Sequence, residues 1–281
     1  MSKYLYSNGL PFSSGLDKNL DALRDRIETN KASLLIIDGG VGEGKTTLAV
    51  HCAEYFQKSK LNFSEQLAMG GVQFQEKLEI CHIKKHPVLI YDEAGDFNSR
   101  SALTKFNQRL NRIFETYRTF KILIILTLPN FSKLDNSLFD NKIPRLLLHV
   151  HGRTKKEGNY AGYSLYRMHY IKEKMRKYTV PSMAYGKTTP NFRGHFKDLT
   201  PERSRELDIF TTKGKENILS DNILKAQGLI YTKEISMKLQ RTDRWVRNKL
   251  KELKIEPARI YKKKKYYHKE ILDLLRDERR Y

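Results

Sequence analysis

The sequence predicts an α/β fold with a mainly parallel sheet, followed by a small C-terminal domain. The first observation is an alternation of short apolar runs with segments of helical periodicity. The apolar runs cover residues 34–37, 88–91 and 122–128, and the helical segments cover residues 20–27, 46–56 and 103–114. Unbroken runs of this length are typical of parallel strands that helices cover on both faces. The second observation is that the last 60 residues show a different pattern, two short helical segments across a turn.

The composition bounds the class of protein. A chain of 281 residues is long enough to bury a substantial core without disulfides. The mean hydropathy is −0.63, and the longest apolar run, residues 122–128, is far shorter than the roughly 20 residues that a membrane-spanning helix needs. The N-terminus lacks an apolar stretch followed by a cleavage site, so we expect a cytoplasmic protein. Cys52 and Cys81 are isolated, which indicates buried small side chains rather than a disulfide or a nucleophile.

The charge is strongly positive and unevenly distributed. The chain has 53 Lys and Arg against 32 Asp and Glu, a net charge of +21. Residues 142–197 contain 13 basic and 2 acidic side chains, and residues 241–267 contain 11 and 3, so these two segments contribute +11 and +8. Such a balance favours a polyanionic partner, nucleic acid first and an anionic membrane surface second. The alternative is that the charge only keeps the chain soluble.

The pattern predicts two domains joined by a linker. We expect a first domain over residues 1–200, because this part carries the alternating pattern of apolar runs and helical segments. Pro201, Gly214 and several polar residues lie at residues 201–222 without sustained periodicity, which is typical of a linker. Residues 223–281 would form the second domain.

A phosphate-binding loop lies between the first apolar run and its helix. It consists of Gly39, Gly40, Val41, Gly42, Glu43, Gly44, Lys45, Thr46 and Thr47, which matches G-x-x-x-x-G-K-[ST]. Glycines let backbone N–H groups wrap an anion, and the start of the following helix adds its positive dipole end. Lys45 would bind the β and γ phosphates of ATP, and the Thr46 hydroxyl would ligate Mg²⁺.

Two acids end the second apolar run. Asp92 and Glu93 directly follow residues 88–91. A carboxylate at the tip of a buried strand beside a phosphate loop holds the shell of Mg²⁺, and a following glutamate orients or deprotonates the attacking water. We therefore assign Asp92 to the metal and Glu93 to the water. The alternative is that both acids only cap the next helix.

These motifs resemble the P-loop ATPases, in particular the additional-strand RecA-like branch that contains the HerA and FtsK DNA translocases and viral packaging ATPases. In that branch an arginine just before the additional strand serves as the finger for the γ phosphate of a neighbouring subunit, and Arg118 matches this position. Arg100 and Arg112 are competing candidates, and a solvated Arg118 is the alternative. Members of the branch usually have a polar glutamine at the end of this strand. This chain has Thr127 as the nearest substitute, and Asn130 is the second candidate.

Residues 30–197 are most similar to the zonula occludens toxin-like ATPases of phages and mobile elements. The similarity is carried by residues 92–95, by Arg100 and Arg118, and by residues 128–131 with 134–135. Phage assembly members of that family carry a membrane segment that this chain lacks, so the resemblance implies the motor and not the membrane role. It also implies a homo-oligomeric ring, and six is the number of subunits that we expect.

The first basic segment predicts a β-hairpin. Strands at residues 145–151 and 160–171 would flank a glycine-bracketed turn with Arg153, Lys155 and Lys156. Aromatic residues recur among the basic ones at positions 160, 163, 166, 170, 178, 185, 192 and 196. Basic residues interleaved with rings suit a groove that follows a nucleic-acid backbone. The alternative is that most rings belong to the core.

The second basic segment predicts a winged helix-turn-helix. A helix at residues 231–239 with a Thr232 cap and a helix at residues 243–253 would flank a short turn. The second helix would bury Trp245, Val246, Leu250 and Leu253 and expose Arg244, Arg247, Asn248 and Lys251. A β wing at residues 259–267 would present Lys263 and Lys264 to DNA phosphates, and a helix at residues 270–276 would close the domain. The alternative is a helical docking module with solvated lysines.

Together these features predict an ATP- and Mg²⁺-dependent DNA motor, for translocation or genome packaging in a virus or mobile element, which would place it in the host cytoplasm. Two alternatives stay open. One is a DNA-binding switch for partition or replication initiation that uses ATP to change state. The other is a membrane-associated secretion or assembly ATPase whose basic segments bind anionic lipid.

Overall fold

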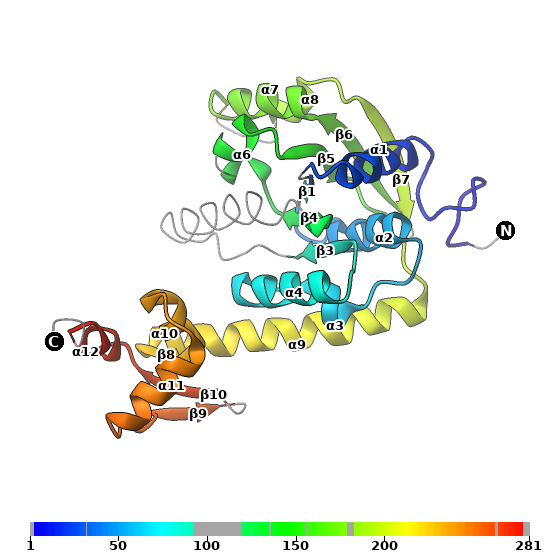
Figure 1. Ribbon diagram of the computed structural model, residues 1–281. Coiled ribbons are helices and arrows are strands. Elements are labelled where there is room, and N and C mark those ends of the chain that lie inside the picture. Colours follow the sequence, from blue (N-terminus) through cyan, green and yellow to red (C-terminus); the bar gives the residue numbers. More distant parts are fainter. Residues whose placement is uncertain are drawn as a thin grey trace. The chain divides into compact units, whose positions relative to one another are not determined.

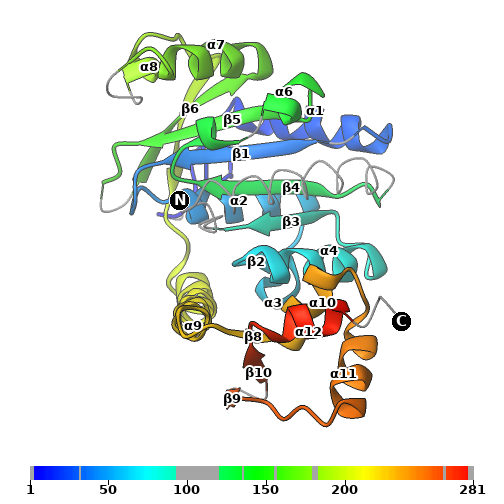
Figure 2. The ribbon, with the colours of Figure 1, turned by 90° about the vertical axis from the view of Figure 1, so that its left-hand side faces the viewer.

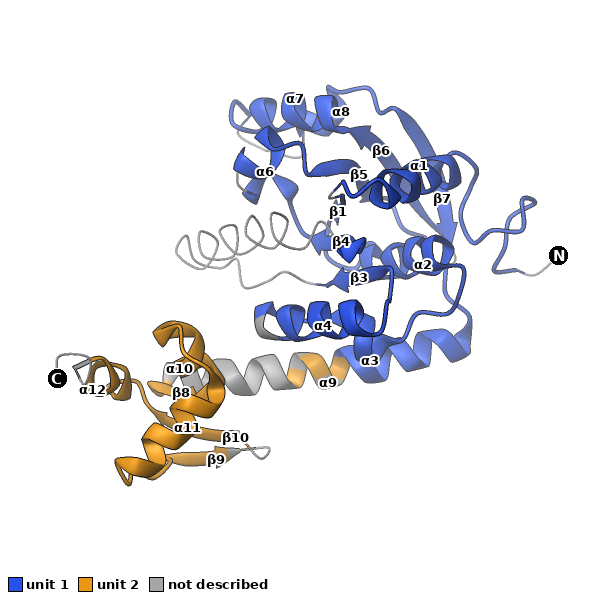
Figure 3. Cartoon of the chain, viewed as in Figure 1, with its two compact units in different colours: residues 1–211 blue, residues 212–281 orange. Residues whose placement is uncertain are grey.

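The computed structural model describes residues 3–31, 33–92, 120–134, 136–154, 157–178, 183–261 and 264–277. The chain divides into two compact units, Met1–Thr211 and Thr212–Tyr281 (Figure 3). Each unit has its own sheet and its own hydrophobic core, and each is described by itself below.

A seven-stranded sheet forms the centre of the first unit (Figure 1). In spatial order its strands are β2 (Leu67–Ala68), β3 (Val88–Tyr91), β4 (Leu123–Leu128), β1 (Leu34–Gly39), β5 (Pro144–His151), β6 (Glu157–Ser164) and β7 (Phe192–Lys197). The first five strands are parallel to one another, β6 is antiparallel to β5, and β7 is antiparallel to β6. The predicted α/β class with a mainly parallel sheet is confirmed. Strand β4 lies between β1 and β3.

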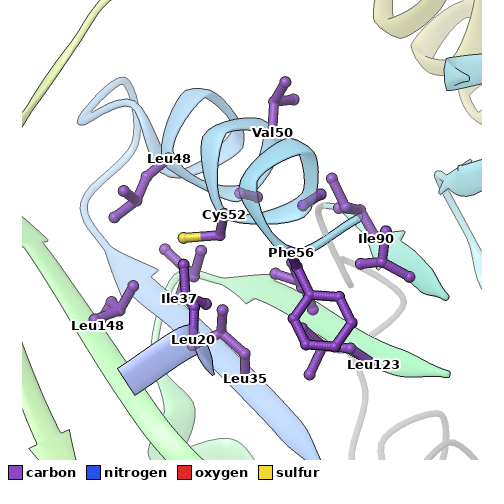
Figure 4. Packing of buried hydrophobic residues seen from close by; sticks show 14 of the residues in the cluster. Leu20, Leu35, Ile37, Leu48, Val50, Cys52, Phe56, Ile90, Leu123 and Leu148 are labelled. Atoms are coloured by element: carbon purple, nitrogen blue, oxygen red, sulfur yellow. The ribbon is translucent and has the colours of Figure 1, made fainter. Parts of the chain in front are cut away.

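Helices cover both faces of this sheet (Figure 2). They are α1 (Leu16–Glu28), α2 (Lys45–Gln57), α3 (Phe63–Gln66), α4 (Gly71–Ile83), α6 (Asn136–Asp140), α7 (Leu165–Met175) and α8 (Met183–Gly186), with a 3-10 turn, η3 (Phe131–Lys133). Alternate residues of β1 point to opposite faces. Leu35 and Ile37 pack with Leu48 and Cys52 of α2 (Figure 4), whereas Leu34 and Ile36 join the cluster that contains side chains of α4 and α7.

The apolar runs predict the strands well. All six residues of β1 and all four of β3 are buried, as expected for strands between two helical layers. The helices predicted at residues 20–27 and 46–56 are α1 and α2. The helix predicted at residues 103–114 lies outside the described residues. Both cysteines are buried and free, as expected, and burial raises the pKa of Cys81 to about 12.

One predicted strand is wrong in its second half. Residues 145–151 do form β5, but the second strand ends at Ser164, and helix α7 follows where residues 160–171 were expected to continue as a strand. Met168, Ile171 and Met175 are buried on one face of α7. Their spacing of three and four residues matches a helix, and Ser164 occupies the N-cap position. The sequence analysis did not detect this periodicity because it followed the aromatic and basic residues of the segment.

The segment assigned to a linker forms most of helix α9 (Pro201–Ala226). Proline is well suited to the first position of a helix because its missing N–H has no intrahelical partner there. Leu207 is buried, and Phe210 lies against Phe63, with 6.5 Å between the ring centroids. A glycine inside a helix, here Gly214, costs about 1 kcal/mol relative to alanine and does not prevent the helix. The boundary between the two units falls inside α9, after Thr211.

The second unit has the helices and the β-hairpin predicted for it, and a strand, β8, that the sequence analysis did not predict. They are β8 (Leu229–Tyr231), α10 (Thr232–Leu239), α11 (Asp243–Glu252), β9 (Arg259–Tyr261), β10 (Lys264–His268) and α12 (Ile271–Asp277). The strands form an antiparallel sheet in the order β8-β10-β9. Ile235, Val246 and Leu250 belong to its core.

The predicted cap of the first of these helices is wrong. Thr232 is the first helical residue of α10, and Tyr231 is at its N-cap. The capping threonine is Thr242 instead, whose Oγ1 accepts a hydrogen bond of 3.1 Å from the backbone N–H of Trp245 at the start of α11.

Among the described residues, no helix is long and apolar enough to cross a membrane.

Candidate nucleotide-binding site

The phosphate loop connects β1 to α2, and its glycines are required by its backbone. Gly39 and Gly44 have φ angles of 142° and 89°, which residues with a Cβ atom rarely adopt. A Cβ atom on Gly39 would lie 2.3 Å from the carbonyl oxygen of Val150, so only glycine lets the loop pass beside β5. Gly44 is the N-cap residue of α2 and has no side chain to occupy the helix end. The amide groups at this end therefore face the place where an anion would bind.

Lys45 begins α2 and folds back over the loop. Its Nζ donates hydrogen bonds to the carbonyl oxygens of Gly39, at 3.0 Å, and Gly40, at 2.6 Å. The ammonium group is therefore already at the loop. Because hydrogen bonds between two charged groups are stronger than those to neutral carbonyls, a phosphate would compete well for this donor.

Three elements bring Thr46, Asp92 and Thr127 together. Thr46 lies in the first turn of α2, Asp92 follows β3, and Thr127 lies near the end of β4. The Thr46 hydroxyl donates to Asp92 at 2.9 Å and 3.0 Å from its two carboxylate oxygens, and the Thr127 hydroxyl donates to Oδ1 at 2.6 Å. Asp92 and Thr127 are buried. The structure thus unites three residues that the sequence analysis placed in the site.

The donor set fits Mg²⁺. This ion prefers oxygen ligands, binds one or two protein groups and keeps several waters. The Thr46 hydroxyl and the Asp92 carboxylate are adjacent oxygen donors beside the phosphate loop, so these two residues would hold the ion or its water shell. When bound with a nucleotide, Mg²⁺ would neutralise charge on the phosphates. Asp92, buried and accepting two hydroxyl groups, is kept in one orientation for this role.

A second buried carboxylate directly precedes the loop, and the sequence analysis missed it. Asp38 ends the apolar run of β1. Its Oδ1 contacts His149 Nδ1 at 2.9 Å, and its Oδ2 accepts from the backbone N–H of Phe131 at 3.2 Å and from the Tyr185 hydroxyl. Burial, together with the negative charge of Asp38, raises the pKa of Tyr185 well above its ordinary value. The signal in the sequence was a charged residue inside a buried strand, which requires partners.

Several predicted residues lie outside the described part of the chain. These are the water-orienting glutamate, the three candidate fingers, and three of the basic residues: Glu93, Arg100, Arg112, Arg118, Lys155, Lys156 and Lys263. Their roles stay predictions. Arg153 is described; it lies in the turn between the antiparallel strands β5 and β6, as predicted, and beside the phosphate loop.

The predicted DNA-contacting side chains of the second unit are exposed. They are Arg244, Arg247, Asn248 and Lys251 on α11 and Lys264 at the start of β10. Arg247 forms an ion pair of 2.6 Å with Asp243 one turn earlier. The exposed side of α11 is therefore basic, and its buried side carries Val246 and Leu250.

The aromatic residues of the first basic segment divide between core and surface. Tyr160, Tyr163 and Phe196 are buried, whereas Tyr166 and Tyr170 on α7 are exposed. Burial favours the core interpretation for the first three rings. Among the described rings of this segment, Tyr166 and Tyr170 are exposed enough to stack on a base, and Tyr178, Tyr185 and Phe192 are only partly exposed.

No family model matches this sequence, and a search of curated proteins gives no significant match. Solved structures with partial similarity include a KaiC-like protein of Pyrococcus horikoshii, with 13% identity over 48% of this chain and 79% of that one and a TM-score of 0.32. The ATPase DotB of Legionella pneumophila has 10% identity over 59% and 56% and a TM-score of 0.29. The flagellar accessory protein FlaH of Methanocaldococcus jannaschii has 16% identity over 52% and 84% and a TM-score of 0.28.

The first unit combines a phosphate loop between β1 and α2 with a strand, β4, inserted between β1 and the acid-tipped strand β3. By this topology and loop, it has the α/β, mostly parallel fold of the RecA-like P-loop ATPases.

Proposed function

We propose that this protein is a Mg²⁺-dependent ATPase that couples hydrolysis to work on DNA, as a ring-shaped motor of a virus or mobile element. The observation that carries the enzymatic part is the contact of Thr46 and Thr127 with the buried Asp92 beside the phosphate loop. A hydroxyl from the first helical turn and a carboxylate from the neighbouring acidic strand are the groups that a metal-bound triphosphate needs.

Each residue has a separate task in this proposal. The loop amides and Lys45 bind the phosphates, and Thr46 with Asp92 holds Mg²⁺. Glu93 would orient the attacking water, and Thr127 keeps Asp92 oriented and senses the γ phosphate. Arg118 of a neighbouring subunit would stabilise charge on the transferred phosphoryl group, which is why a ring is part of the proposal.

The DNA part rests on the second unit. Its order of elements, β8-α10-α11-β9-β10 with a three-stranded antiparallel sheet, supports a winged helix-turn-helix. Helix α11 would be the recognition helix, and Lys264 lies at the tip of the β9-β10 hairpin. Exposed cations on a helix that packs through its apolar side suit insertion into the major groove. We assign nucleotide hydrolysis to residues 1–200 and DNA binding to residues 223–281, with residues 201–222 of α9 between them.

The test is steady-state ATP hydrolysis with and without duplex DNA. Lys45→Ala should lower hydrolysis by at least about a hundredfold, because the charge on the β and γ phosphates loses its main side-chain partner. Lys18→Ala is a matched control, since Lys18 is an exposed lysine of α1. Hydrolysis that survives Lys45→Ala would refute the proposed site.

A switch that binds DNA and uses ATP only to change state is the second candidate, favoured by the separate core of the second unit. Glu93→Gln separates the two. In a motor it should abolish DNA-stimulated hydrolysis while ATP binding persists. A switch should hydrolyse ATP slowly even as wild type and release DNA at each turnover.

A further inference from the structure

Arg153 lies beyond the carboxyl end of strand β5, on the side of the sheet where the phosphate loop begins. Strand β5 runs parallel to β1, with Val150 beside Gly39, and ends at His151. Arg153 follows two residues later. In parallel sheets, ligands bind at the carboxyl ends of the strands. The fold therefore delivers this arginine to the candidate nucleotide site from the same chain.

The contacts of Arg153 lie on the loop itself. Its backbone N–H donates a hydrogen bond of 3.0 Å to Glu43 Oε2. Its Nη1 lies 2.7 Å from the position that a Cβ atom on Gly44 would take, so the guanidinium touches the backbone where α2 begins. Its Nη2 forms an ion pair of 2.5 Å with Asp198. Both the backbone and the side chain are thus held against residues 43 and 44.

The chemistry of the guanidinium suits a phosphate at this position. Arginine has five N–H donors in a planar fork that matches phosphate oxygens. The ion pair with Asp198 uses one edge of the fork, and 30% of the side chain remains exposed. Loop amides at the start of the helix surround the α and β phosphates of a bound nucleotide. Gly44 is the N-cap residue of that helix.

We propose that Arg153 binds the α or β phosphate of the nucleotide held by its own phosphate loop, in competition with the ion pair that it forms with Asp198. The inference rests on the proposed nucleotide site. It gives Arg153 a ligand different from the DNA expected from the sequence. It also differs from an arginine finger, which comes from a neighbouring subunit and acts on the γ phosphate.

The experiment measures the Kd of fluorescent ATP and ADP analogues for the full chain without DNA. Arg153→Ala should weaken both nucleotides by about tenfold, because it removes a charge-assisted hydrogen bond from a phosphate present in both. Arg193→Ala is the matched control, an exposed arginine on β7, and should change the Kd by less than about twofold. A loss confined to ATP would put the arginine at the γ phosphate and overturn the assignment.

Asp198→Asn separates phosphate binding from a purely structural role. If Arg153 only fixes the loop through its ion pair, breaking the pair from either side should weaken nucleotide binding equally. If Arg153 binds phosphate, Asp198→Asn should leave the affinity unchanged or increase it, since the guanidinium loses a competing anion. Equal losses in Arg153→Ala and Asp198→Asn would therefore overturn the proposal.

Two further measurements separate this inference from the proposed function. Lys45→Ala in the same assay should abolish nucleotide binding. If it does while Arg153→Ala binds like wild type, the arginine inference fails and the nucleotide site stands. If wild type binds neither nucleotide, both fail. In the absence of nucleotide, Arg153→Ala should bind duplex DNA with the affinity of wild type. If the variant binds DNA more weakly but binds nucleotide like wild type, Arg153 contacts DNA and the proposal is wrong.

Discussion

The two units contain two candidate anion sites of opposite construction. In the first unit, backbone amides, one lysine and the buried Asp92 converge on a single loop, and Thr46 and Thr127 reach the same carboxylate. In the second unit, Arg244, Arg247 and their neighbours are exposed side by side on α11. The first arrangement fixes a few groups in contact with one another. The second spreads many cations over a surface.

This difference predicts how each site responds to mutation and salt. Groups that share one hydrogen-bonded cluster are coupled, so single substitutions have large effects that do not add. Exposed cations that each contact a separate phosphate act nearly independently, and their contributions fall as salt rises.

Asp92→Asn should have the largest effect. It keeps the shape of the side chain but removes the negative charge and leaves one oxygen in place of two for Thr46 and Thr127. We expect ATP hydrolysis to fall by at least about a hundredfold, because the metal loses its charged partner. Steady-state hydrolysis at saturating Mg²⁺ measures this, and circular dichroism checks that the fold persists. A rate within about threefold of wild type would show that Asp92 is not in the hydrolytic site.

Thr127→Val should have an intermediate effect and should reveal the coupling. It removes one hydroxyl from Asp92 without changing the size of the side chain much, and hydrolysis should fall by about tenfold. In the Asp92→Asn background the same substitution should change little, since the acceptor it serves is already altered. A double-mutant cycle measures this coupling. Additive effects would instead place Thr127 outside the Asp92 cluster.

Substitutions on α11 should be smaller and additive. Arg244→Ala and Arg247→Ala should each weaken duplex DNA by several-fold and should each reduce the slope of log K against log salt by about 1. The double variant should show the sum. Fluorescence anisotropy over a series of salt concentrations measures both quantities. Arg205→Ala, an exposed arginine of α9, is the control. If the salt slope does not change, α11 is a docking surface and not a DNA-binding helix.

The sequence could predict the parts of the molecule that depend on local pattern. Strands β1, β3 and β4 coincide with the short apolar runs, and the positions of Lys45, Thr46 and Asp92 follow from spacing alone. It could not predict helix α7, because basic and aromatic residues between Met168 and Met175 masked the helical spacing. Nor could it predict contacts between distant segments. Asp38 meets His149, and Arg153 meets Glu43, only because β5 pairs with β1.

The smallest predicted effect concerns stability and again separates the two units. Burial lowers the pKa of His51 in the first unit, although the Lys197 carbonyl and the charges of Glu54 and Asp198 act in the opposite direction. The second unit has one histidine, His268, and it is exposed.

An unfolded histidine has a pKa near 6.5. Below that pH the unfolded first unit binds a proton that the folded unit does not, so its stability should fall as the pH decreases from about 7 to 5. Thermal unfolding of the full chain across this range measures the fall. The His51→Gln variant keeps an N–H group that can reach the Lys197 carbonyl, but the glutamine does not titrate. The fall in Tm between about pH 7 and pH 5 should therefore be smaller in the variant than in wild type by a few degrees. An equal dependence in wild type and variant would mean that other groups set the acid sensitivity of the first unit.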